Sequence, residues 1–171
     1  MRYLSIGSVL AILILAGGGC TQSLANQAVE RVVENKIESE SGQNVDVDFG
    51  DDSVSFSDDE SGASGTFGTD VKLGDDFPSD IPLPNDISVT GVANSPDGVW
   101  VSYTTNQSGA DLQAWYESEL KADDWSLQGS FINDSAGNSG TALYEKDGVS
   151  IGVITTDSDG TTTVMVTRSE D

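Results

Sequence analysis

Hydrophobic and polar residues alternate over most of the second half of the chain, which is the pattern of half-buried β-strands. Residues 95–98, Ser-Pro-Asp-Gly, separate the first two such stretches with the residues of a tight turn. One stretch instead has helical spacing, preceded by Ser108 as the expected N-cap; its large hydrophobic residues are Leu112, Trp115, Tyr116 and Leu120. The predicted elements are strands at 87–93 and 99–103, a helix at 109–122, and strands at 125–132, 141–145, 149–155 and 162–167.

The first half carries shorter patterns. Two alternating stretches, 45–49 and 54–56, flank Gly-Asp-Asp and predict a hairpin, with 63–68 as a third strand. Hydrophobic residues at helical spacing predict a helix over 24–39. We therefore expect an α+β fold, in which an N-terminal helix and a short β-meander precede an antiparallel sheet with one packed helix, in the order β-β-α-β-β-β-β.

These patterns divide the chain into four segments. A connection rich in proline, with Pro78, Pro82 and Pro84, marks the last boundary because proline removes backbone donors and favours extended backbone. The expected segments are a signal peptide (1–19), an anchor with a helix (20–43), an acidic β-meander with a linker (44–76) and an α+β domain (77–171). All three Trp residues lie at position 100 or later, so the main core is expected in the last segment.

The first twenty residues have the layout of an export signal. Arg2 precedes an uncharged apolar run over 4–16, and three glycines follow it before Cys20. The run is shorter than the roughly 20 residues that a membrane-spanning helix needs. The segment resembles the lipobox of prokaryotic lipoproteins, with Gly17 where leucine is usual. This resemblance implies that Cys20 receives a diacylglyceryl group as a thioether, whereas an ordinary secretory peptide would leave Cys20 as a free thiol.

The chain is strongly acidic. The sequence has 29 Asp and Glu, 7 Lys and Arg, and a net charge of −22; removal of Arg2 with the signal would make it −23. Such a chain repels nucleic acid and anionic headgroups, which excludes a nucleic-acid function. The abundance of Asp is similar to that of proteins from salt-adapted organisms, because high salt screens repulsion between like charges.

The sequence offers few candidate catalytic residues. The sequence contains no His and one Cys, so it can form neither a Ser-His-Asp nor a Cys-His arrangement. No glycine-rich phosphate loop occurs outside the signal. We therefore expect no enzyme activity, no cofactor and no assigned catalytic or metal residue.

Two further features leave alternatives open. The acids Asp46, Asp48, Asp51 and Asp52 suggest a calcium-binding surface module, although the order of ligands in an EF-hand is absent. Trp100 alternates with Val99 and Val101 and is predicted to point away from the core that they form. There it could stack on a sugar or a partner, or pack beneath the connection rich in proline, which we favour.

The lipid anchor on Cys20 is the one feature of the sequence to which we assign a specific chemical role. The chain also resembles a family of uncharacterised prokaryotic envelope and secreted proteins in three segments, FPSDIPLP, VWVSY and LQAWYESELKADDW. This resemblance implies an accessory role in the envelope. We expect a protein that is anchored to the membrane through lipid on Cys20, faces outside the cytoplasm, and binds or scaffolds an envelope protein partner. The calcium-binding module is the alternative. Asn106 and Asn133 begin glycosylation triplets on expected loops.

Overall fold

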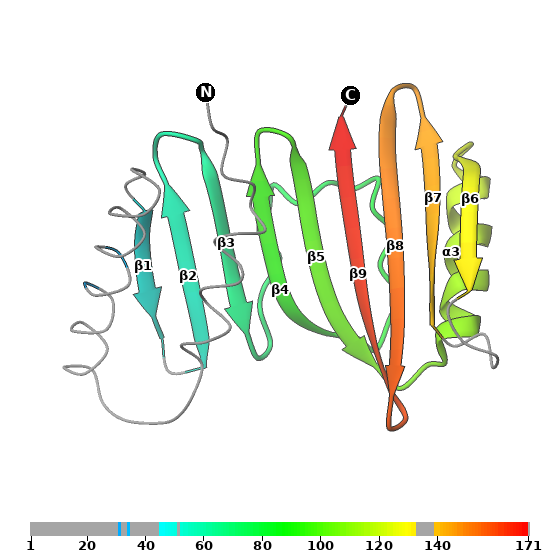
Figure 1. The fold of residues 1–171 in the computed structure, drawn as a ribbon, viewed down its shortest axis with the longest axis horizontal. Coiled ribbons are helices and arrows are strands. Elements are labelled where there is room, and N and C mark those ends of the chain that lie inside the picture. Colours follow the sequence, from blue (N-terminus) through cyan, green and yellow to red (C-terminus); the bar gives the residue numbers. More distant parts are fainter. Residues whose placement is uncertain (1–30, 32–33, 35–44, 51, 133–138, 171) are drawn as a thin grey trace.

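One antiparallel sheet of nine strands makes up most of the molecule (Figure 1). The computed structural model describes residues 31, 34, 45–50, 52–132 and 139–170. The strands stand side by side in the order β1-β2-β3-β4-β5-β9-β8-β7-β6. Their bounds are β1 Val45–Phe49, β2 Ser53–Asp58, β3 Ala63–Gly68, β4 Ser88–Ser95, β5 Gly98–Thr105, β6 Ser126–Ile132, β7 Gly140–Lys146, β8 Val149–Ser158 and β9 Thr161–Glu170, with helix α3 at Gly109–Ala122.

The expected α+β arrangement, an N-terminal helix with a meander followed by an antiparallel sheet with a helix, is wrong. The meander strand β3 pairs directly with β4, for example Phe67 with Gly91, so the meander and the later strands form one continuous sheet. Alternation in the sequence fixes the two faces of each strand, but it carries no signal for this pairing across the connection at 69–87. The helix expected over 24–39 lies outside the described residues except for Arg31 and Glu34, which are helical.

The two faces of the sheet differ, and we name them after α3. On the helix face lie Val101 and Tyr103 of β5 with their neighbours on β9, Val166 and Val164. On the far face lie the alternate residues, such as Trp100 beside Thr167. Each name applies across all nine strands, because directly paired residues of antiparallel strands point to the same face.

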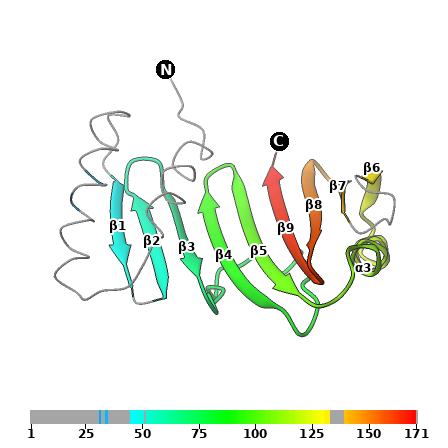
Figure 2. The ribbon, with the colours of Figure 1, turned by 60° about the horizontal axis from the view of Figure 1, so that its bottom comes forward.

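The main core lies on the helix face of β5, β7, β8 and β9. Helix α3 covers one end of this face (Figure 2). Residues 69–87, which we call the strap, cover the rest and contribute the buried Ile81. An ion pair of 2.9 Å between Arg168 Nε and Asp80 Oδ2 fixes the strap to β9. The buried members of the core are Ile81, Val101, Tyr103, Leu112, Tyr116, Leu120, Trp125, Ala142, Tyr144, Ile151, Val153, Val164 and Val166.

Helix α3 confirms the local prediction for 109–122. The Ser108 side-chain oxygen accepts a hydrogen bond of 3.1 Å from the backbone N–H of Asp111, which satisfies a donor of the first turn. The predicted stripe faces the core, with Leu112, Tyr116 and Leu120 fully buried. The Tyr116 hydroxyl lies 3.0 Å from the Tyr103 hydroxyl, so this buried pair joins helix to sheet.

A second, smaller hydrophobic cluster lies on the far face of β1 to β5. Its buried members are Val45, Val47, Phe56 and Ala93, and its other members are Phe49, Val54, Phe67 and Trp100. The rings of Phe67 and Trp100 meet at 5.4 Å over Gly91, where a Cβ would lie 2.7 Å from the indole. Trp100 therefore packs on the face opposite the strap, and our expectation that it lies beneath the strap is wrong.

Candidate functional site

Several residues that the sequence singled out lie outside the described part of the chain. These are Cys20, with the whole signal segment, and Asn133. Asn106 is described and lies exposed just before α3. Among the described residues, no helix is long and apolar enough to cross a membrane.

The acidic residues that suggested calcium binding are exposed wherever the structure describes them. Asp46 and Asp48 lie together on the exposed helix face of β1, where their neighbours on β2 are Ser57 and Ser55. Asp51 is outside the described residues, and Asp52 is exposed. Within the described ranges, no three Asp, Glu or Cys residues are grouped so that they could hold a metal ion. The geometry of the described residues therefore does not support the calcium-binding hypothesis.

The far face differs from the rest of the surface in its lack of charge. From β5 to β6, Glu145 is the one ionisable residue among those that the strand register places on this face. Threonine, serine and hydrophobic side chains make up the remainder. In a chain with 29 acidic residues, a sheet face of this extent with one charge is the clearest departure from the overall composition.

One row of paired residues crosses this face from edge to edge. It runs from the small hydrophobic cluster across the uncharged surface and ends in the exposed strand β6. In order across the nine strands, the row is Val47, Phe56, Gly65, Ala93, Trp100, Thr167, Gly152, Leu143 and Gly129.

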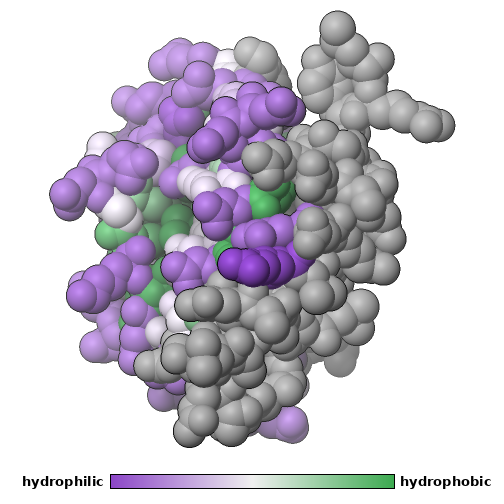
Figure 3. Space-filling view, turned by 90° about the vertical axis from the view of Figure 1, so that its left-hand side faces the viewer, coloured by the Kyte–Doolittle hydropathy of each residue, from purple (hydrophilic) through white to green (hydrophobic). Residues whose placement is uncertain are grey.

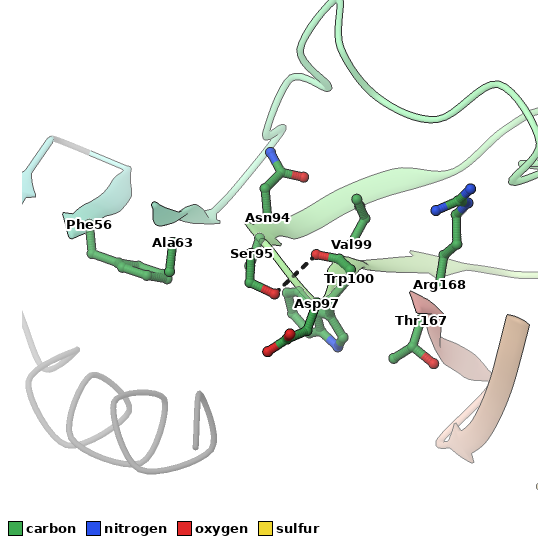
Figure 4. Close-up of a pocket in the computed structure, with 11 residues that line it drawn as sticks. Phe56, Ala63, Asn94, Ser95, Asp97, Val99, Trp100, Thr167 and Arg168 are labelled. Atoms are coloured by element: carbon green, nitrogen blue, oxygen red, sulfur yellow. Dashed lines mark hydrogen bonds between the residues drawn. The ribbon is translucent and has the colours of Figure 1, made fainter. Parts of the chain in front are cut away.

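A groove of about 300 Å³ opens where β4 turns into β5 (Figure 4). Phe56 and Ala63 line one side, and Thr167 lines the other. Trp100 lies between these sides and points to the same face as Ser95 and Thr167, whereas Asn94, Val99 and Arg168 point the opposite way. The groove thus presents an aromatic surface with small and hydroxyl-bearing neighbours.

The turn at the end of the groove is held by its own contacts. Ser95 Oγ donates a hydrogen bond of 3.2 Å to the carbonyl of Gly98, shown dashed in Figure 4. Gly98 adopts φ of 152°, and a Cβ there would collide with the Arg168 carbonyl, so β5 can approach β9 this closely only with glycine. The preformed turn places Asp97, an exposed carboxylate, at the rim.

Arg168 is one of the residues that line the groove, but its side chain points away from it. Its Nε donates to Asp80 and its Nη1 donates to Glu170, each at 2.9 Å, on the helix face. The hydrogen bond that Arg168 donates to Asp80 is the largest cause that raises the pKa of Arg168 above its ordinary value, so the guanidinium stays charged and bound to the strap. The groove chemistry is therefore set by Trp100, Phe56 and hydroxyl groups, which suit stacking on a flat or apolar group and offer no nucleophile with a base.

Comparisons with known proteins found no match: no protein family, no curated protein and no solved structure matches the chain. Sequence reasoning identified Trp100 as facing away from the main core but missed the groove and the uncharged face. The available signal was the run of threonines and serines between the buried positions of β8 and β9, where acids would have been expected from the composition.

Proposed function

We propose that this chain is an extracytoplasmic protein, anchored through lipid on Cys20, that binds a partner through the far face of its sheet. The uncharged far face carries this proposal. At a net charge of −22, acids are spread over most exposed segments, but the register places only Glu145 on this face between β5 and β6. Desolvating hydroxyl and apolar groups costs far less than desolvating carboxylates, so this is the face that can be covered at the lowest cost.

The groove beside Trp100 is the proposed centre of that surface. Aromatic side chains dominate binding energy because they bury a large area with few rotatable bonds. Trp100 is half-buried and rigid, since Phe67 and Gly91 support its ring from the sheet side. It can therefore contact a partner without first losing conformational freedom.

The anchor and the acidic body support each other in this proposal. One acyl chain holds a protein only marginally, whereas a diacylglyceryl group supplies two chains and stable attachment. Anionic headgroups repel a body of such charge, so the lipid keeps the protein at the membrane while the body stays off its surface. The partner is expected to be an envelope protein, and no catalytic step is proposed.

The anchor is tested with a Cys20→Ala variant of the full chain. Cells fed labelled fatty acid should label the wild-type protein and not the variant, and the variant should leave the membrane fraction. Label that persists in Cys20→Ala would contradict the anchor.

The binding face is tested by placing a charge on it. Thr163→Glu adds a carboxylate at an exposed far-face position of β9, and Ser57→Glu adds the same charge on the acidic face of β2. Crosslinking in intact cells should lose the adducts with other proteins in Thr163→Glu and keep them in Ser57→Glu. Equal patterns from both variants would remove the far face as the binding surface, and binding heat with calcium would favour the cation-binding alternative.

A further inference from the structure

The two edges of the sheet differ in how they are protected. The β1 edge carries Asp46 and Asp48, and the backbone N–H of Val47 donates a hydrogen bond of 3.2 Å to Glu34 Oε1. Seen from this side, the described surface is mostly hydrophilic around a smaller hydrophobic area (Figure 3). Inward or edge-placed charges of this kind prevent the edge strands of natural sheets from pairing with other chains.

The β6 edge has none of these protections among the described residues. All seven residues of β6, Ser126–Ile132, are exposed, and its sequence SLQGSFI holds neither a charge nor a proline. Strand β6 is the last in the sheet order, so its outer side pairs with no described strand. An uncharged, unpaired edge is a template for adding another strand.

A hydrophobic patch continues from this edge onto the far face. Phe131 is 68% exposed, Leu143 is 46% exposed and Ile154 is 38% exposed, and the strand register places all three on the same side of β6, β7 and β8. Beside them, Gly129 leaves open space, because a Cβ at that position would meet no atom within 4 Å. Phe131 and Gly129 flank Ser130 and lie on the same face of β6.

We propose that a second copy of this chain pairs with the first through β6, antiparallel, about a two-fold axis at Ser130. In this register, Phe131 of each copy lies opposite Gly129 of its partner, and Ser130 lies opposite itself. Each phenyl ring then fills the open space over a glycine beside Leu143, an arrangement known to stabilise glycine in sheets. The interface is isologous, because each copy offers the same strand.

The self-complementary spacing favours a second copy over an unrelated strand. The Phe131 ring and the open space over Gly129 lie two residues apart on the same strand. An antiparallel second copy related by a two-fold axis places each Phe131 opposite a Gly129, so the contact forms twice. A two-fold axis perpendicular to the sheet also puts both far faces on the same side and joins their hydrophobic patches. Because both copies are strongly acidic away from β6, their association must strengthen as salt screens the repulsion.

A disulfide across the axis tests this geometry in the full chain. Directly paired residues of antiparallel strands have Cβ atoms about 5 Å apart, close enough for a disulfide after small movements. Ser130→Cys should therefore form a covalent dimer when membranes are oxidised with copper phenanthroline, and about 1 M NaCl should raise the yield. Wild type, which holds only Cys20, gives the baseline, and Thr163→Cys, exposed on the far face of β9 and away from β6, reports random collisions.

Further variants separate the competing outcomes. Adding Phe131→Glu to Ser130→Cys should lower the yield roughly tenfold, because a carboxylate would be buried in the interface. Adding Ser57→Glu instead puts the same charge on β2, far from the β6 edge, and should leave the yield nearly unchanged. Equal dimer yields from Ser130→Cys and Thr163→Cys would overturn the proposal, as would a yield that falls with salt, which would indicate a basic partner at this edge.

Discussion

The two halves of the sheet bury opposite faces. Strands β5, β7, β8 and β9 bury the helix face beneath α3 and the strap, whereas β1, β2 and β3 direct Val47, Phe56 and Phe67 to the far face. The change occurs across β4 and β5, where Trp100 serves the smaller cluster and Val101 the main core. One continuous sheet can thus carry two cores, provided that the strands at the junction are hydrophobic on both sides.

The halves also differ in what completes their cores. The main core has a second layer, because side chains from α3 and the strap close over the strands. Among the residues that the structure describes, every member of the smaller cluster belongs to a strand, from Val45 in β1 to Trp100 in β5. Among the described residues the main core has 13 buried members and the smaller cluster has 4, so the main core is expected to supply most of the stability.

The largest effect is expected from removing the contact between the two layers. Leu112→Ala empties a fully buried position under α3 and should lower the free energy of unfolding by about 2 to 5 kcal/mol. Leu127→Ala on β6 is the control, because Leu127 is 36% exposed and should change the free energy by less than about 1 kcal/mol. Urea denaturation followed by circular dichroism measures both. Similar losses from the two variants would mean that α3 does not carry the main core.

A smaller effect is expected at the junction between the halves. Gly91→Ala places a Cβ 2.7 Å from Trp100 and 2.8 Å from Phe67, so the two rings must move apart. Overpacking of this kind costs about 1 to 3 kcal/mol, and tryptophan fluorescence should shift as well. Gly129→Ala is the matched control, because its Cβ enters open space and no loss of monomer stability is expected. If Gly91→Ala were also neutral, the packing of Trp100 on Phe67 would not join the halves.

The smallest effect concerns the hydroxyl pair beneath α3 at alkaline pH. Burial raises the pKa of Tyr103 to about 12 and raises that of Tyr116 above its ordinary value near 10. A raised folded-state pKa means that stability is fully present below pH 10 and falls as pH rises through the folded value, because the unfolded chain ionises first. The loss at pH 11 should be about 1 kcal/mol for each tyrosine.

The matched variant removes both hydroxyls at once. In Tyr103→Phe with Tyr116→Phe, neither phenol remains to ionise or to lack a partner, so urea midpoints at pH 8 and pH 11 should lie closer together than in wild type. Some alkaline loss should persist, since burial also raises the pKa of Tyr144. An unchanged difference between the two pH values would place the ionisation elsewhere in the chain.

Local structure could be predicted because it depends on neighbouring residues. The predicted helix has the bounds of α3, Ser108 caps it, and each strand expected from alternation is present within a few residues of its predicted ends. The side to which Trp100 points was also predictable, since alternation sets it. The groove was not, because Phe56, Ala63 and Trp100 come from three strands whose neighbours depend on pairing across the strap.

The amino-acid sequence by itself determined the elements of this protein, their two-sided character, the acidic charge and the absence of histidine chemistry. Only the tertiary structure decided that β3 pairs with β4, that the buried face changes sides at β4 and β5, and that β6 is left as an uncharged edge. The physical reason is that periodicity acts over a few residues, whereas strand order is settled by contacts between distant segments that compete to bury the same apolar surface.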